Sequence, residues 1–218
     1  MQLKHHIDAE LESIGLSCIR GERTLFSDLT FTLSPGEIQQ ISGTNGSGKT
    51  SLLRTLCGLS LPESGQILWS KKNIRSQFHE YFKNLFYLGH ANGIKSDLTP
   101  LENLQIYSKL TLSESYMDPK TALERVRLHE FQNDPCNTLS AGQLRRVSIA
   151  RVLLANVPLW ILDEPIAAID SSGIELVEEL FDEHISKNGM ILFTSHRPLG
   201  ANSRHNVIIE LSEFNVKE

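Results

Sequence analysis

Cysteine is scarce in this sequence, and its distribution is irregular. The 218 residues include three cysteines, which form neither a Cys-x-x-Cys pair nor a metal-binding spacing: Cys18, Cys57 and Cys136. An odd number of widely spaced cysteines argues against a disulfide framework and is typical of a reducing compartment. We therefore expect the three thiols to behave as small, buried hydrophobic side chains.

Long hydrophobic runs are also absent. A membrane-spanning helix needs roughly 18 consecutive apolar residues. The longest apolar run, residues 152–162, is interrupted by Asn156 and Pro158. We expect no direct insertion into a membrane, so that any membrane contact comes through a partner protein.

The sequence carries no excess of basic charge. It has 21 Lys and Arg residues against 26 Asp and Glu, a net charge of −5. Proteins that bind nucleic acid usually show a basic patch or stripe, so we expect no nucleic-acid partner. A hydrophobic content of 40% is ordinary for a globular protein, and the length fits a single large domain, 1–218.

Short apolar runs alternate with helical patterns along most of the chain, which predicts an α/β protein. Turn residues such as Gly21-Glu22 and Ser34-Pro35-Gly36-Glu37 separate the first strands. We expect strands at residues 16–19, 29–33, 38–42, 66–69, 159–162, 190–194 and 207–211, and helices at 49–57 and 171–185.

The middle of the chain has a different pattern. Apolar residues recur at helical spacing in 101–110, 119–128 and 141–154, with no convincing strand among them. The pattern predicts a helical subdomain at about 91–156, inserted between the 1–90 and 157–218 parts of a nucleotide-binding core.

A glycine-rich loop follows the expected strand 38–42 and precedes the expected helix 49–57. It matches the phosphate-binding pattern G-x-x-x-x-G-K-[ST], with the residues Gly43, Thr44, Asn45, Gly46, Ser47, Gly48, Lys49 and Thr50. Glycines let successive backbone N–H groups converge on phosphate oxygens. We expect ATP as the ligand, with Lys49 reaching the β- and γ-phosphates, Thr50 ligating Mg²⁺, and Ser51 completing the loop's contacts.

Two acids follow the apolar strand 159–162. Ligands bind at the carboxyl ends of strands in open α/β sheets, and Asp163 and Glu164 stand at such an end. Asp163 is predicted to hold Mg²⁺, a cation that prefers oxygen ligands. Glu164 is predicted to act as the general base that polarises the attacking water.

A third motif, Leu139-Ser140-Ala141-Gly142-Gln143, precedes a helix that Ser140 can cap. By itself it would be an ordinary capped helix. With the two motifs above, the sequence resembles the ABC ATPase family, whose signature is Leu-Ser-Gly-Gly-Gln; Ala141 replaces one glycine. The resemblance covers about residues 12–211. It implies the P-loop NTPase fold of that family: a mixed sheet core with an antiparallel β subdomain and an inserted helical subdomain.

The resemblance also implies a homodimer. In the family, the start of the signature helix closes on the γ-phosphate held by the opposite subunit, so two ATP molecules are sandwiched. Ser140, Gly142 and Gln143 would thus complete the nucleotide site of the other copy. Asp170 would lie in the loop that crosses the dimer interface, and His196 would contact the γ-phosphate and serve catalysis with Lys49 and Glu164.

Two positions depart from the common family pattern. His90 stands where a glutamine usually senses the γ-phosphate and metal, and Arg20 stands where an aromatic residue usually stacks on adenine. A guanidinium can also stack on a π face, so both residues are included in the predicted nucleotide site.

These departures, together with segments 24–27, 89–95 and 98–104, resemble the ATP-binding subunits of cytochrome c biogenesis, which are associated with haem export. The resemblance implies a peripheral subunit on the cytoplasmic face of a bacterial inner membrane. Its partners would be the integral membrane subunits of that system.

Other functions remain open at this point. The chain could serve a different small-solute exporter, or it could be a soluble ABC ATPase that acts on nucleic acid or ribosomes. A non-hydrolysing regulatory subunit is a further alternative, suggested by His90 and Arg20 but opposed by the intact acids Asp163 and Glu164. A small GTPase is excluded because the sequence has no N-K-x-D motif.

Overall fold

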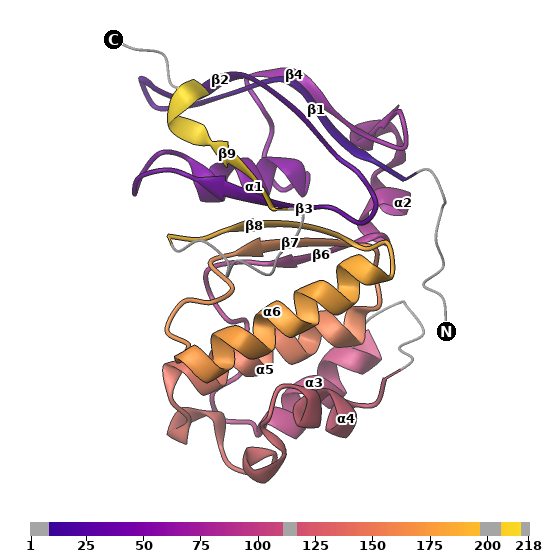
Figure 1. Ribbon diagram of the computed structural model, residues 1–218, viewed down its shortest axis with the longest axis vertical. Coiled ribbons are helices and arrows are strands. Elements are labelled where there is room, and N and C mark those ends of the chain that lie inside the picture. Colours follow the sequence, from indigo (N-terminus) through magenta and orange to yellow (C-terminus); the bar gives the residue numbers. More distant parts are fainter. Residues whose placement is uncertain (1–8, 111–116, 197–205, 215–218) are drawn as a thin grey trace.

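A computed structural model describes residues 9–110, 117–196 and 206–214. Figure 1 shows two sheets, one above the other, with helices between them and below them. Within the described ranges, no helix is both long enough and apolar enough to cross a membrane.

The upper sheet is antiparallel and has the strand order β2-β1-β4-β5. Its strands are β1 Leu11–Arg20, β2 Arg23–Leu33, β4 Ser64–Trp69 and β5 Lys72–Asn73. The first two are much longer than the sequence patterns predicted. Bulges in β1, one of them around Gly15 with φ +59°, break the period-two alternation by which a strand is recognised.

The lower sheet is parallel and has the strand order β6-β7-β8-β3-β9. Its strands are β3 Ile38–Ser42, β6 Leu85–Leu88, β7 Leu159–Asp163, β8 Met190–Thr194 and β9 Asn206–Glu210. The sequence predicted all of these except β6. The expected α/β fold is confirmed, with the antiparallel and parallel pairings divided between two sheets.

Both faces of the parallel sheet are buried, which explains its continuous apolar runs. On β7, Leu159 and Ile161 belong to the core shared with α1 and the antiparallel sheet. Trp160 and Leu162, which alternate with them, belong to the core shared with the helices on the other side. In Figure 1, α1 lies between the sheets, α5 and α6 cover the opposite face of the parallel sheet, and α3 and α4 lie beyond them.

Three of the helices begin at side chains that cap them. Asp118 accepts from the backbone N–H groups that open α4, Ser140 and Gln143 form a capping box on α5, and Asp170 caps α6. The α-helices are α1 Lys49–Leu56, α2 Phe78–Phe82, α3 Pro100–Leu110, α4 Pro119–Arg125, α5 Ala141–Ala155 and α6 Ser171–Ser186.

Helices α3, α4 and α5 all lie between β6 and β7 in the chain and pack on one another. Helix α4 ends three residues earlier than the sequence pattern predicted, because the chain turns at Arg127, where φ is +56°. The division of the chain into 1–90, 91–156 and 157–218 remains a prediction.

Two of the three thiols, Cys57 and Cys136, are fully buried, and Cys18 is half-buried; all three are free.

Candidate nucleotide-binding site

The loop between β3 and α1 has the backbone that a phosphate cradle requires. Gly43, Gly46 and Gly48 have φ values of +148°, +80° and +103°, which favour glycine. A Cβ on Gly43 would lie 2.7 Å from Ser47 Oγ, so the loop leaves no room for a side chain there. Ser47 Oγ is buried without a hydrogen-bond partner among the described residues, as a group reserved for a ligand would be.

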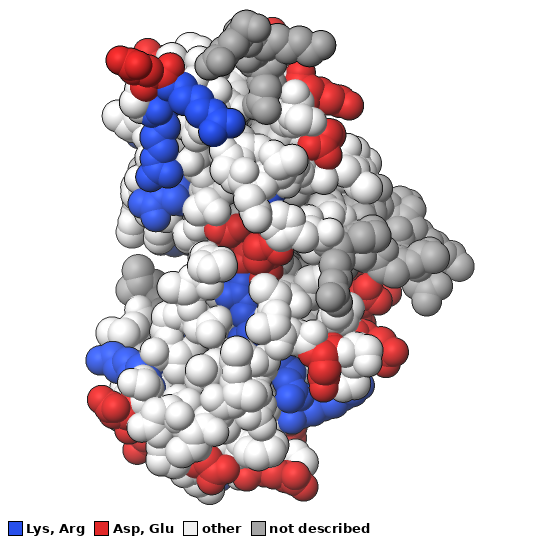
Figure 2. Space-filling model, turned by 90° about the vertical axis from the view of Figure 1, so that its left-hand side faces the viewer, with Lys and Arg blue, Asp and Glu red and all other residues white. Residues whose placement is uncertain are grey.

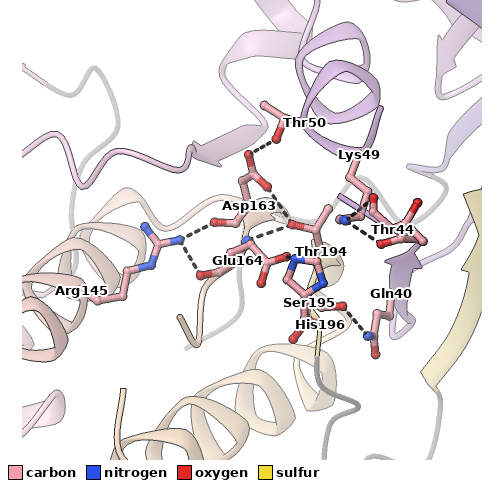
Figure 3. Close-up of polar contacts among 11 residues, drawn as sticks. Gln40, Thr44, Lys49, Thr50, Arg145, Asp163, Glu164, Thr194, Ser195 and His196 are labelled. Carbon is pink, nitrogen blue, oxygen red and sulfur yellow. Dashed lines mark hydrogen bonds and ion pairs between the residues drawn. The ribbon is translucent and has the colours of Figure 1, made fainter. Parts of the chain in front are cut away.

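Lys49 lies across this loop. Its Nζ donates to the carbonyl oxygens of Gly43, at 2.7 Å, and Thr44, at 3.1 Å (Figure 3). The residue is 8% exposed, and within the described part of the chain no carboxylate lies at ion-pair distance from it. The ammonium charge is therefore available to an anion. The loop residues Thr44 and Asn45 are exposed to solvent. The loop leads into the first turn of α1, which contains Thr50 and Ser51.

A chain of hydrogen bonds links α1 to the ends of β7 and β8 (Figure 3). Thr50 Oγ1 donates to Asp163 Oδ2 at 2.8 Å, and Thr194 Oγ1 donates to Asp163 Oδ1 at 2.8 Å. Thr194 in turn accepts from the backbone N–H of Glu164 at 2.9 Å. The parallel register that pairs Asp163 with Thr194 places these groups side by side.

Glu164 has an unusual backbone. Its φ is +51°, in the left-handed region. This conformation costs of order 1–3 kcal/mol at a non-glycine residue and is found mainly where the surrounding structure of a functional site enforces it. Its Oε1 is buried, lies 3.4 Å from His196 Nε2 and makes no hydrogen bond among the described residues. The segment that carries His196 is held by Gln40, whose Nε2 donates to the Ser195 carbonyl at 3.2 Å.

Thr50 and Asp163 suit a magnesium ion. A hydroxyl and a carboxylate, already 2.8 Å apart beside the loop, are hard oxygen donors, and Mg²⁺ in nucleotide sites takes few protein ligands besides water and phosphate. Among the described residues, no group of three or more His, Cys, Asp or Glu side chains could hold a metal by itself. The pair therefore fits a metal that arrives with its nucleotide.

The signature segment forms a rigid helix start. Gln143 N donates to Ser140 Oγ at 3.2 Å, and Ser140 N donates to Gln143 Oε1 at 2.8 Å. A Cβ on Gly142 would lie 2.7 Å from the Ala168 carbonyl oxygen, so α5 packs directly on the backbone that follows β7. Ala168 is itself left-handed, with φ +60°.

The structure separates the predicted site residues into two groups. The loop, Lys49, Thr50, Asp163, Glu164 and His196 lie together, as described above. Among the described residues, no hydrogen bond or ion pair joins this group to Arg20, His90, Ser140, Gly142, Gln143 or Asp170. Arg20 is exposed at the end of β1, and His90 is exposed just after β6. Asp170 Oδ1 accepts from Gly173 N at the start of α6.

Sequence reasoning assigned no role to three residues that the structure places at the site. Thr194 bridges Asp163 and the backbone of Glu164, and Arg145 contacts the carbonyls beside them. Tyr87 lies near Asp163; burial, reinforced by that negative charge, raises the pKa of its phenol to about 12. Only Thr194 had a sequence signal, its place at the end of a buried strand. The partners of Arg145 are mainly backbone carbonyls, which leave no mark in the sequence.

Comparison with known proteins agrees with this geometry. The model of the ABC transporter family matches residues 26–167. Cytochrome c biogenesis ATP-binding export proteins CcmA are similar over most of the chain. The one from Yersinia pestis is 49% identical over 197 residues, covering 90% of this chain and 90% of the relative. The one from Methylococcus capsulatus is 49% identical (88% and 93% covered), and the one from Aliivibrio fischeri is 42% identical (93% and 100%).

Solved structures show the same fold. An ABC transporter ATP-binding protein from Pyrococcus furiosus superposes with a TM-score of 0.80 at 24% identity, covering 95% of this chain and all of that one. An ATP-binding subunit of an ABC transporter gives 0.77 at 26% identity, with 92% and 86% covered. Together with the family match and the relatives, these structures show that the chain belongs to the ABC transporter family and is an ATPase of the ABC type.

Proposed function

We propose that this chain is the ATP-hydrolysing motor subunit of a bacterial export complex of cytochrome c biogenesis, and that the cargo of this complex is haem. The named relatives are export proteins of that process, and they match this chain over most of both lengths. The subunit would sit peripherally on the cytoplasmic face of the inner membrane, held by integral membrane partners.

The loop and Lys49 would bind the phosphates of ATP. Converging backbone N–H groups and the positive end of α1 favour an anion at this place. Lys49, now bonded to the neutral carbonyls of Gly43 and Thr44, can exchange one of them for a phosphate oxygen at small cost. Arg20 would stack on the base, and Ser51 would add a contact to the phosphates.

Hydrolysis would then depend on the two acids. Thr50 and Asp163 would hold Mg²⁺, which neutralises charge that develops on the phosphates. Glu164 Oε1, which makes no hydrogen bond among the described residues and lies 3.4 Å from His196 Nε2, could polarise a water molecule. His196 would contact the γ-phosphate beside that base, and His90 would sense the same phosphate from the loop after β6.

A second copy would complete the site. Ser140, Gly142 and Gln143 form a rigid helix start that makes no hydrogen bond to the loop of its own chain, among the described residues. In a homodimer this helix start would close on the nucleotide of the other copy, with Asp170 at the interface. Contacts with the γ-phosphate would then favour the closed dimer, and hydrolysis would allow the dimer to reopen.

The hydrogen-bonded path from Thr50 through Asp163 and Thr194 to Glu164 is the observation that carries this proposal. In the purified membrane complex, we expect Glu164→Gln to bind ATP normally while its turnover falls at least about 100-fold, because the general base is lost. Lys49→Ala should lose both binding and turnover. Glu175→Gln, which alters an exposed glutamate of α6, is the matched control. Wild-type hydrolysis by Glu164→Gln would refute the assignment of the base.

The cargo needs a separate test. In a strain that lacks this gene, the wild-type chain should restore haem-stained c-type cytochromes and the Lys49→Ala chain should not. The tagged protein should also co-purify with integral membrane proteins of that system. Normal cytochromes in the deletion strain would instead favour the exporter of another small solute.

The face drawn in Figure 2 gives little support to a nucleic-acid function. One group of basic side chains lies at its upper left, and elsewhere basic and acidic residues are scattered among uncharged ones, so the basic residues described there do not run across the face. A protein that tracks a phosphate backbone needs a continuous basic stripe. Recovery of nucleic acid rather than membrane proteins with the tagged chain would reverse this conclusion.

A further inference from the structure

The side chain of Arg145 lies at a junction of three segments. It comes from the second turn of α5 and is 4% exposed. A guanidinium has five N–H donors, and all of these have acceptors within the described chain: the carbonyl oxygens of Gly89, Asp163, Glu164 and Pro165, and Oδ1 of Asn92. Figure 3 shows the group pointing at the backbone where β7 ends.

None of these five acceptors is a carboxylate oxygen. Burial lowers the pKa of Arg145, although the nearby charges of Asp163 and Glu164 oppose this shift. A buried cation that binds only neutral oxygens is not placed there to form an ion pair. What it does fix is the path of two backbone segments, residues 163–165 and the loop 89–92.

The first of these segments sets the position of Glu164. Its N–H donates to Thr194 Oγ1 at 2.9 Å, and its carbonyl accepts from Arg145 Nη2 at 2.9 Å. The backbone between these two bonds is left-handed. Since Oε1 of Glu164 makes no hydrogen bond among the described residues, the direction of the carboxylate depends on this backbone.

The second segment carries His90. Arg145 Nη1 donates to Gly89 O at 3.1 Å and to Asn92 Oδ1 at 3.2 Å. Two further residues of the same face of α5 fasten this loop, since Ser148 Oγ and Arg151 Nη1 each donate to Asn92 O at 3.0 Å. Of these three, Arg145 alone also binds the segment that holds Glu164.

We propose that Arg145 is a positioning residue for hydrolysis. Its planar guanidinium holds the backbone of Glu164 at a fixed position relative to α5 and to the loop that carries His90. A movement of α5 or of this loop would therefore also move the carboxylate of Glu164. The inference rests on the proposed role of Glu164 as the base. It concerns turnover and not nucleotide binding, because the hydrogen bonds of Arg145 among the described residues go to 89–92 and 163–165 and not to 43–50.

The test uses Arg145→Lys and Arg145→Gln in the full complex. An ammonium cannot reproduce the planar fork, and a displacement of about 1 Å at a reacting group can cost about 100-fold in rate. We expect kcat to fall by about that factor, while the Kd for Mg·ATP of the purified chain changes by less than about threefold. Arg146→Gln is the control, because Arg146 is the next residue and its one hydrogen bond within the described ranges goes to Val126 O, at 3.4 Å.

Several results would overturn the proposal. One is a wild-type kcat for Arg145→Lys, and another is a Kd that rises as much as kcat falls. Failure of Arg145→Lys to fold, judged by thermal unfolding, would make Arg145 a folding residue instead. In the double variant with Arg145→Lys and Glu164→Gln, kcat should be no lower than in Glu164→Gln alone, because the carboxylate that Arg145 positions is already gone. A double variant whose kcat falls by the product of the two single effects would contradict the proposal. An inactive wild-type complex would refute the proposed function together with this role, whereas an active complex with a wild-type kcat for Arg145→Lys would refute this role alone.

Discussion

At the scale of single residues, Asp163 and Glu164 are neighbours with different surroundings. Both oxygens of Asp163 accept a hydroxyl hydrogen bond, from Thr50 and from Thr194. Oε1 of Glu164 accepts none from the part of the chain that the structure describes and lies 3.4 Å from His196 Nε2. An acid held by two donors is oriented for a metal, whereas an acid with a free oxygen can take a proton from water. The surroundings thus support the two roles proposed for these acids.

Gly142 offers a residue-scale test of how tightly α5 must pack. Helix propensity alone predicts that Gly142→Ala stabilises the protein by up to about 1 kcal/mol. The new Cβ, however, would lie 2.7 Å from the backbone oxygen of Ala168, which cannot rotate away. Overpacking of this kind costs about 1–3 kcal/mol. We therefore expect Gly142→Ala to lower the free energy of unfolding, measured in urea, and to slow ATP hydrolysis.

The control for this prediction is Ala141→Gly, one residue earlier. Ala141 is exposed, so removal of its methyl group should affect stability only through helix propensity, by at most about 1 kcal/mol. A Gly142→Ala protein that is more stable than the wild type would show that the contact with Ala168 is loose.

At the scale of elements, an ion-pair cluster joins α4 to α6. Glu183 of α6 binds the guanidinium of Arg125 on α4 and, at 2.6 Å, the ammonium of Lys187. The hydrogen bond from Arg125, helped by Lys187, lowers the pKa of Glu183 to about 2. Because the folded-state pKa lies below the unfolded one, the pair stabilises the protein above the usual glutamate pKa. This stabilisation is lost as the pH falls through the folded-state value.

We accordingly expect Glu183→Gln to be less stable than the wild type near neutral pH, by no more than about 1 kcal/mol because the cluster is about one-third exposed to solvent or more. The difference should be full above about pH 5 and should shrink as the pH falls toward 2. Urea unfolding of both proteins across this range measures it. A difference that grows on acidification would contradict the assigned shift.

The elements also show how far the sequence could be interpreted. Continuous apolar runs identified β7 and β8, because each strand is buried on both faces. Strand β3, which contains Gln39 and Gln40, was identified instead from its place between a turn and the glycine-rich loop. The four residues of β6 carry an apolar run, Leu85–Leu88, but follow closely on α2 with neither Gly nor Pro before them. The bulges of β1 hid its length, since they shift side chains from one face to the other.

The site was predictable where its chemistry is concentrated in consecutive residues. The loop 43–50 and the pair Asp163 and Glu164 have fixed patterns, so their residues could be named in advance. The bonds of Arg145 could not be foreseen, because its acceptors are backbone groups brought together only by the fold. The parts proposed for Arg20, His90 and the second copy remain predictions, because a single chain does not test them.

At the scale of the whole molecule, assembly in pairs is the main prediction. Glu164→Gln with Mg·ATP should be trapped in the closed state and should give twice the chain mass of 24.5 kDa by light scattering. Ser140→Arg in the same protein should keep it monomeric, because a bulky cation would occupy the place of the γ-phosphate contact. Omission of Mg·ATP is the second control. A dimer that persists without nucleotide, or with Ser140→Arg, would argue against this mode of closure.

The strand that carries the phosphate loop has a particular place in the parallel sheet. On one side β3 pairs with β8, and on the other with β9, strands that begin at Met190 and Asn206. The ribosome needs roughly 7–30 s to add the intervening 150 or so residues at about 5–20 residues per second. During that interval the nascent chain already contains the loop, but its strand has neither neighbour. The nucleotide pocket is thus completed only after β8 and β9 have been added, so a product truncated before them would expose the unpaired β3 to chaperones and proteases before it could hold ATP.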